Sequence, residues 1–283
     1  MSEDPLVSVV IPVFNGLPYL PQTVASILDQ DYPNLELVLV DGGSTDDSLE
    51  WLQQQTDPRI TCHALPSRTP AATTWTVACE RARGEFVKMM GQDDILRPDA
   101  LTAQVAALQT HPDAGLATGL RDIIAADGSV IFHGRGLIGL REGCNAGTEV
   151  LRQTYLAGTN IIGEPFAVLF RRAALVPALP WSDARPLLLD LDLYTTVLST
   201  WDLAVQRRTI GSFRVSATSW STRIASSQSA QLRAWQGEYE ADHPDLTRRL
   251  RITAVLNVRR NTMLRRAAYL WLRLRRGLHP AAR

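Results

Sequence analysis

Several features that mark common protein classes are scarce or missing in this sequence. Only three of its 283 residues are cysteines, and no two of them stand in a CxxC spacing. This excludes a disulfide framework and a cysteine zinc site, and it is typical of a reducing cytoplasm. No apolar run approaches the ~20 residues of a membrane-spanning helix, and the start, MSEDPLVSVV, carries acids where a signal peptide needs positive charge. We therefore expect a cytoplasmic chain, soluble or peripherally attached to the inner membrane.

Acidic residues are also missing from the C-terminal end. The 29 basic and 29 acidic residues balance overall, yet the segment from Leu246 onward holds eleven arginines and neither Asp nor Glu. Such a basic segment indicates an anionic partner, with a membrane surface or a nucleic acid as the options. Hydrophobic residues make up 45% of the chain, which is enough for one large α/β domain with an appendage.

The first part of the chain alternates strand-like and helix-like segments. Apolar runs rich in β-branched residues predict strands at 7–14, 35–40, 59–65 and 86–90. Helical spacing predicts helices at 20–30, 44–55 with Ser44 as N-cap, 73–83 and 98–110. This alternation with short connections predicts a parallel sheet with right-handed crossovers.

Polar residues stand where these predicted strands end. Asn15 follows the first strand, Asp41 the second, and Asp93 with Asp94 the fourth. In open α/β sheets, ligands bind beyond the carboxyl ends of the strands. We therefore expect these side chains to meet at one edge of the sheet, although each could also belong to an ordinary turn or helix start.

The pattern is looser after residue 115. We expect short strands at 122–125 and 129–133, a strand at 166–170, a helix at 187–200, short strands at 204–207 and 213–216, and helices from 228 with a break at Pro244. Glu164 borders either an acceptor pocket or a plain turn. The predicted division is a domain at 1–225, with a nucleotide-binding half (1–110) and an acceptor-side half (111–225), and a basic helical region at 226–283.

Three ordered motifs carry a resemblance to a known family. The segments VSVVIPVFN, LELVLVDGGSTDDSLEWL and ARGEFVKMMGQDDILRPDAL together resemble the inverting family 2 glycosyltransferases. Their GT-A fold is a Rossmann-like, nucleotide-binding mixed sheet flanked by helices. The resemblance covers about residues 7–108 and returns weakly near Asp190. It implies transfer of a sugar, by a single in-line displacement, from a nucleotide-diphosphate sugar to a glycan or lipid-linked acceptor, as in bacterial surface polysaccharide synthesis.

The resemblance also implies roles for particular residues. The stretch that contacts the nucleoside maps to Pro12, Val13, Phe14 and Asn15. Asp41 corresponds to the acid near the base or ribose.

The remaining implied roles concern metal and proton transfer. Asp93 corresponds to the carboxylate that joins Mg²⁺ or Mn²⁺ to the nucleotide diphosphate, with Asp94 as a supporting metal ligand. Asp190 corresponds to the general base that opens a later helix. Asp192 is the second candidate for that role, because two acids near a helix start could also serve only the helix dipole.

Two glycines depart from the family pattern. Gly42 replaces a second acid after the second strand, and Gly91 replaces the first acid of the DxD motif. They keep open a non-catalytic nucleotide-sugar-binding relative. A nucleotidyltransferase is the other alternative, but the stretch from Val13 to Leu17 lacks the Lys or Arg of a phosphate loop.

Two C-terminal features remain. Arg214 and the segment 219–221 resemble a lid that closes over the donor, with an ordinary loop as the alternative. Further on, Leu256, Met263 and Leu270 recur every seven residues beside a basic row that includes Arg259. This predicts an amphipathic basic helix on an anionic membrane, or else a helix packed on protein; no nucleic acid partner is expected.

Overall fold

The structure is a computed structural model that describes residues 4–215 and 228–276, with side chains to residue 265 and at residue 267. In these ranges the strands are β1 Val7–Val13, β2 Leu35–Asp41, β3 Ile60–Ala64, β4 Phe86–Met89, β5 Ile95–Leu96, β6 Ala114–Ala125, β7 Val130–Arg135, β8 Gly143–Asn145, β9 Val168–Arg171 and β10 Asp202–Val215. The α-helices are α1 Leu20–Leu28, α2 Ser48–Gln53, α3 Ala71–Glu80, α4 Ala100–Thr110, α5 Gly147–Ala157, α6 Arg172–Leu175, α7 Leu189–Leu198, α9 Gln228–Asp242 and α10 Arg248–Arg276. Two 3-10 turns, η1 Pro165–Ala167 and η2 Val176–Ala178, complete the elements.

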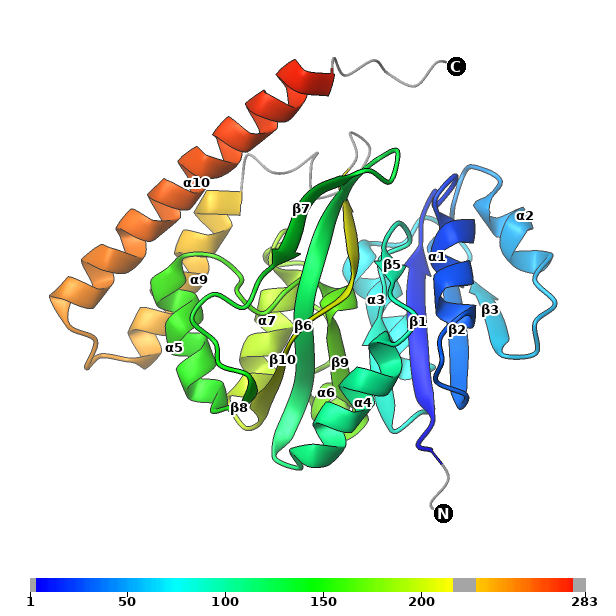
Figure 1. Ribbon diagram of the computed structural model, residues 1–283, viewed down its shortest axis with the longest axis horizontal. Helices are drawn as coiled ribbons and strands as arrows, with labels where there is room; N and C mark the ends of the chain where they lie inside the picture. Colours follow the sequence, from blue (N-terminus) through cyan, green and yellow to red (C-terminus); the bar gives the residue numbers. More distant parts are fainter. Residues whose placement is uncertain (1–3, 216–227, 277–283) are drawn as a thin grey trace.

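One mixed sheet organises the molecule (Figure 1). Its strand order is β3-β2-β1-β4-β9-β6-β10-β5, with β7 beside β6 and β8 beside β10. The strands β3, β2, β1 and β4 are parallel, as the sequence predicts for the nucleotide-binding half. Strand β9 runs antiparallel to both β4 and β6, and β10 is parallel to β6. The sheet as a whole is therefore mixed, not uniformly parallel.

Helices cover both faces of the sheet because its central strands are apolar on both sides. In β1, Val7, Val9, Ile11 and Val13 belong to one core cluster with residues of α1 and α4. Val10 belongs to the other cluster, which includes residues of α3, α5 and α7. Side chains alternate between the two faces of a strand, so the continuous apolar run contributes to both clusters.

The C-terminal helices pack against α5. The Tyr155 and Tyr239 rings stack with centroids 5.0 Å apart, and Gln236 Nε2 donates to the main-chain oxygen of Tyr155 at 2.8 Å. Asn257 and Asn261 of α10 donate to carbonyls at the end of α5. Figure 1 shows the C-terminal half of α10 projecting away from the sheet. The predicted boundary at residues 225 and 226 lies outside the described residues and stays a prediction.

Lys88, the only lysine in the sequence, is fully buried in β4. Its amine donates a hydrogen bond to Gln104 Oε1 at 2.6 Å, and the Gln104 amide donates to the carbonyls of Ala117 and Ala167. Burial lowers the pKa of Lys88 from 10.5 to about 7, since a low-dielectric interior disfavours the charged amine. This polar group thus joins β4 to α4, β6 and η1 in the middle of the sheet.

Candidate functional site

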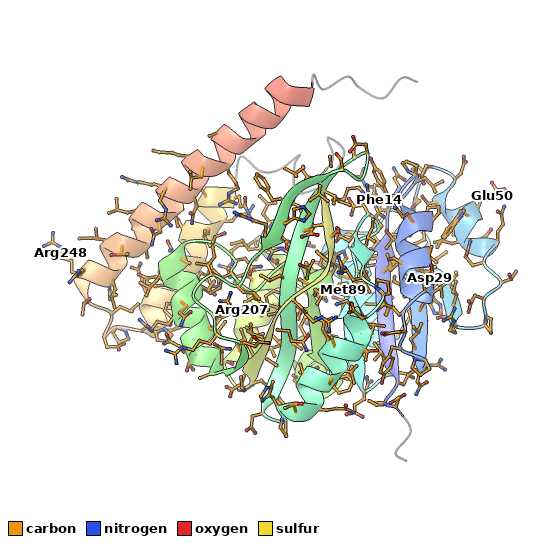
Figure 2. All side chains as sticks on the ribbon, in the orientation of Figure 1. Phe14, Asp29, Glu50, Met89, Arg207 and Arg248 are labelled. Atoms are coloured by element: carbon orange, nitrogen blue, oxygen red, sulfur yellow. The ribbon has the colours of Figure 1, made fainter. Side chains whose placement is uncertain are left out.

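The loop after β1 presents two of the four residues predicted to contact a nucleoside. Pro12 and Val13 are buried within β1, so any contact of theirs with a nucleoside would be made by the main chain, and this contact stays a prediction. Phe14 is 37% exposed at the carboxyl end of the strand (Figure 2). The guanidinium of Arg68 lies 5.3 Å from the centre of its ring. A flat aromatic surface at this edge can support a nucleoside base.

Asn15 joins this loop to the loop after β2. Its φ of 52° lies in the left-handed region, which Asn tolerates better than most residues. The main-chain N–H of Asn15 donates to Ser44 Oγ at 3.0 Å, and the Asn15 side-chain oxygen accepts the main-chain N–H of Thr45 at 2.8 Å. Ser44 is therefore not the N-cap that the sequence predicts; α2 begins four residues later, after Asp47.

Asp41 ends β2 and is buried. Its Oδ2 accepts the N–H groups of Gly43 and Ser44 at 2.9 and 3.0 Å. No donor among the described residues reaches Oδ1, and a buried acceptor without a partner carries a free-energy cost that a ligand donor would remove. Beside it, a Cβ at Gly42 would lie 2.9 Å from Thr74 Oγ1, so Gly42 packs closely against α3.

The Asp93–Asp94 pair lies between β4 and β5, and its two members have different surroundings. Asp93 is partly exposed, whereas Asp94 is buried and its Oδ1 accepts the Arg214 N–H at 3.1 Å. Burial, followed by the charge of Asp93, raises the pKa of Asp94 well above its ordinary value. Two crowded carboxylates favour a cation between or beside them.

Arg214 fixes the backbone of this pair. It belongs to β10, is buried, and donates from Nε to the Asp93 carbonyl at 2.9 Å and from Nη2 to Gln22 Oε1 at 2.6 Å. Its guanidinium also donates to two carbonyls at the end of β6. Arg214 is therefore part of the sheet and not of a lid, and residues 219–221 lie outside the described residues.

Asp190 stands in the first turn of α7 and is partly buried. Its Oδ2 accepts a hydrogen bond from Asn160 Nδ2 at 2.8 Å, and its Oδ1 accepts the Leu191 N–H at 2.8 Å. Burial is the largest cause that raises the pKa of Asp190 to about 7, and the charge of Glu164 adds to it. A carboxylate with a pKa near neutrality is suited to general base work.

Asp192 faces a different environment. It accepts two hydrogen bonds from Arg185 Nε, at 2.9 and 3.1 Å, and Arg185 also pairs with Glu238 of α9. Residues two apart do not share a helix face, so Asp190 and Asp192 point to separate surroundings. Through Arg185, Asp192 contributes to the contact between α7 and α9; its catalytic role stays a prediction.

The sequence pattern did not indicate that Arg121, Asn160 and Glu164 lie together near Asp190. Glu164 forms an ion pair with the buried Arg121 of β6. Asn160 donates from Nδ2 both to Asp190 and to the Gly163 carbonyl. An arginine inside the apolar strand 114–125 is the one sequence signal that could have indicated a buried anion nearby.

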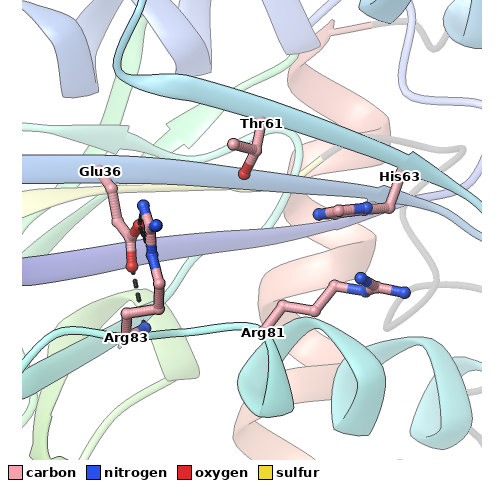
Figure 3. Close-up of a pocket in the computed structure, with 5 residues that line it drawn as sticks. All are labelled: Glu36, Thr61, His63, Arg81 and Arg83. Atoms are coloured by element: carbon pink, nitrogen blue, oxygen red, sulfur yellow. Dashed lines mark hydrogen bonds and ion pairs between the residues drawn. The ribbon is translucent and has the colours of Figure 1, made fainter.

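A shallow pocket lies away from these residues (Figure 3). It is lined by Glu36, Thr61, His63, Arg81 and Arg83, and Glu36 pairs with Arg83 across it. None of the predicted site residues lines this pocket.

Solved structures share the fold of this chain. S. aureus TarS, residues 1–349, aligns with a TM-score of 0.62 and 16% identity over 89% of this chain and 70% of that one. The mannosyltransferase PcManGT from Pyrobaculum calidifontis, in complex with GDP-Man and Mn²⁺, aligns with a TM-score of 0.60 and 18% identity over 96% and 81%. The fold is the GT-A fold, a mixed sheet flanked by helices, as expected from the sequence.

Sequence comparisons agree with the structural ones. The putative teichuronic acid biosynthesis glycosyltransferase TuaG of Bacillus subtilis is 37% identical over 127 residues, which cover 44% of this chain and 50% of that protein. The chain thus matches about half the length of such curated relatives. The family model described as glycosyl transferase family 2 matches residues 8–175, more than half of the chain. This chain therefore belongs to glycosyl transferase family 2.

Proposed function

We propose that this chain is an inverting, metal-dependent glycosyltransferase. It would transfer a sugar from a nucleotide-diphosphate sugar to a hydroxyl of a glycan or lipid-linked acceptor, in bacterial surface polysaccharide synthesis. The observation that carries the proposal is the convergence of three acids. Asp93 and Asp94 contact Arg214 of β10, and the neighbouring strand β6 carries Arg121, the ion-pair partner of Glu164. Asn160 donates both to Asp190 and to the carbonyl of Gly163, the residue before Glu164. One series of contacts therefore joins these acids although they are far apart in the chain.

The nucleotide end of the proposed site is formed by the loops after β1 and β2. Phe14 offers a partly exposed ring, and Asp41 Oδ1 offers an acceptor that no described residue satisfies. A base or ribose donor would satisfy this acceptor. TarS, which shares the fold, is also known in complex with UDP-GlcNAc, which supports a nucleotide-sugar donor here.

The residues present fit a divalent cation held partly by substrate. No three acidic, His or Cys side chains in residues 4–215 and 228–265 are grouped so as to hold a metal on their own. Mg²⁺ sites in phosphate-transferring enzymes commonly use one or two carboxylates plus substrate phosphates and water. Asp93 would hold the ion, with Asp94 behind it. When bound, the ion would neutralise charge on the departing diphosphate.

Asp190 would accept the proton of the acceptor hydroxyl. The acceptor oxygen forms its bond to the anomeric carbon while the bond from that carbon to the diphosphate oxygen breaks. The proton passes to a carboxylate oxygen of Asp190, and the nucleoside diphosphate leaves. The Asn160 amide keeps the carboxylate oriented, which matters because a general base acts only within hydrogen-bond reach.

A direct test measures release of nucleoside diphosphate. We expect UDP or GDP to be released from a nucleotide sugar in the presence of Mn²⁺, and EDTA to stop the release. Thermal shift with each donor identifies the preferred one, because a ligand that binds only the folded state stabilises it. Binding of a donor without release, with every acceptor extract tried, would instead favour the non-catalytic relative.

We further propose that α10 attaches the protein to the anionic inner face of the membrane. Ala254 and Val258 of α10 are buried in the core. On the opposite face Ile252, Leu256 and Met263 are 49%, 56% and 69% exposed.

Exposed arginines flank this apolar face: Arg248, Arg249, Arg259 and Arg260. An apolar stripe between arginines suits the boundary between lipid headgroups and acyl chains. No described helix is long and apolar enough to span a bilayer. The side chains of Leu270 and of Arg266 and Arg273 lie outside those described.

Vesicle binding checks this attachment. The double variant Met263→Glu, Leu264→Glu should bind vesicles containing phosphatidylglycerol at least about 10-fold more weakly than the parent chain, because both apolar and electrostatic attraction fall. Ile138→Glu, at a side chain 62% exposed elsewhere, is the matched control and should bind as the parent does. Equal binding by all three chains would show that α10 serves protein packing alone.

A further inference from the structure

Glu164 and Arg121 form an ion pair built from separate parts of the chain. Arg121 projects from β6, and Glu164 lies in the loop between α5 and η1. Arg121 Nη2 donates to Glu164 Oε1 at 3.0 Å, and Nε pairs with Oε2. The arginine side chain is only 10% exposed, whereas the Glu164 side chain is 28% exposed. One partner is thus held inside the protein while the other remains within reach of a ligand.

Two glycines make room for this arrangement. Gly136 has a φ of 109°, and a Cβ there would lie 2.2 Å from Arg121 Nη1. Gly163 has a φ of 129° and directly precedes Glu164. Both conformations are ones that residues with a side chain rarely adopt. The pair therefore depends on backbone shaped for it in two loops, unlike an incidental surface ion pair.

The pair lies between the two ends of the proposed catalytic site. The Asn160 amide donates to Asp190 Oδ2 and to the Gly163 carbonyl, which fixes the start of the Glu164 loop against the proposed base. On the other side, Arg121 lies in β6, which pairs with β10, and β10 carries the Arg214 that contacts Asp93 and Asp94. In a single displacement, the base and the diphosphate lie on opposite sides of the anomeric carbon, so the donor sugar occupies the space between them.

Gathering a third carboxylate between two others costs stability, because like charges repel. The Arg121 guanidinium offsets this charge, and its hydrogen bond to Oε1 holds the carboxylate in place. A carboxylate held in this way keeps lone pairs for other donors. Sugar hydroxyls are the donors that a transferred sugar would bring to this position.

We propose that Glu164 binds hydroxyl groups of the donor sugar and determines which sugar is accepted, with Arg121 as the residue that positions it. This inference rests on the proposed glycosyltransferase function. It assigns recognition of the sugar to β6 and the α5–η1 loop. Recognition of the nucleotide remains with the loops after β1 and β2.

Comparing each nucleotide sugar with its nucleoside diphosphate distinguishes recognition of the sugar from recognition of the nucleotide. Calorimetry with Mn²⁺ compares UDP with UDP-GlcNAc and GDP with GDP-Man, for the parent chain and for Glu164→Gln. We expect the affinity for the accepted nucleotide sugar to fall about 10- to 100-fold, as for loss of hydrogen bonds to a charged group. The affinity for the matching nucleoside diphosphate should stay unchanged. Gly136→Ala, which displaces Arg121 without touching Glu164, should give the same pattern.

Glu149→Gln is the matched control, because it breaks the exposed Glu149–Arg152 pair on α5, and it should bind both ligands as the parent does. Equal weakening of the nucleotide and the nucleotide sugar by Glu164→Gln, or no weakening of either, would overturn the inference while the proposed function stands. A parent chain that binds none of the four ligands would refute the proposed function, and this inference with it.

Discussion

Replacing Asp190 by Asn should remove sugar transfer while donor binding persists. Asn cannot accept the proton of the acceptor hydroxyl, and general base catalysis contributes about 10²- to 10⁴-fold to a rate. The donor contacts proposed for Asp41, at the end of β2, and for Asp93, between β4 and β5, do not involve α7 and stay in place. Steady-state transfer rates and calorimetric donor affinities, measured on the same preparations, check both halves of this expectation.

The variant Asp192→Asn distinguishes the role of Asp192 from that of Asp190 in α7. It breaks the hydrogen bonds to Arg185, so we expect a lower melting temperature and a kcat within a few-fold of the parent. If Asp192→Asn lost transfer as completely as Asp190→Asn, the assignment of Asp190 as the base would be wrong.

The pH dependence of the parent chain provides a further check on Asp190. Its folded pKa of about 7 is above its ordinary value of 3.8. Activity should therefore rise with pH through about 7, as the carboxylate becomes able to accept a proton. The stability linked to this group has the opposite trend: it is fully present below pH 3.8 and is lost as pH rises through about 7. Asp190→Asn should thus raise the melting temperature at pH 8, where the parent carries a buried charge.

Replacing Asp93 by Ala should abolish the metal dependence of donor binding. Asp93 is the more exposed member of the pair, so we expect it to hold the cation directly. Its loss leaves a buried Asp94 that already accepts an N–H from Arg214. Titration of the preferred donor with and without Mn²⁺ should show a large difference for the parent chain and none for Asp93→Ala.

Glu80→Ala removes an exposed carboxylate at the end of α3 and serves as the control for this titration. It should keep the full response to Mn²⁺. A parent-like response in Asp93→Ala would contradict the metal assignment, and a loss confined to Asp94→Asn would move that assignment to Asp94.

The first part of the fold, to about residue 110, could be predicted closely because its signals are local. The sequence pattern predicted both ends of each strand from β1 to β4 to within one residue. The second half was harder. Residues 204–207 and 213–215 belong to one strand, β10, and residue 216 lies outside the described residues. The middle of β10 contains Arg207 and Arg208 and has register shifts against β6.

The expected short strand at 122–125 is only the end of β6, which begins at Ala114. Gly115 and Gly119 lie within this strand, where a Cβ would approach Trp201 and Ile210 to 2.7 and 2.6 Å. These glycines permit close packing. The expected strand at 166–170 begins as the turn η1 and becomes β9 only at Val168.

The candidate site also has features that could be predicted from the sequence and features that could not. Asp41, Asp93, Asp94 and Asp190 follow strands or open a helix, so their positions could be predicted from local pattern and motif; their roles stay predictions. The contacts around them could not. Arg121 and Glu164 are 43 residues apart, and Arg214 and Asp93 are 121 apart. Such pairs are set by strand order in the completed sheet, which local periodicity does not encode.

The burial of Lys88 gives the folded chain a chemical property that can be used. Its amine is enclosed in the middle of the sheet, so reagents that acylate primary amines reach it only when β4 separates from its neighbours. Because this is the only lysine in the sequence, acylation of a lysine side chain can occur at one position alone. The rate at which mass spectrometry detects that acylation therefore reports how often the centre of the sheet opens under native conditions.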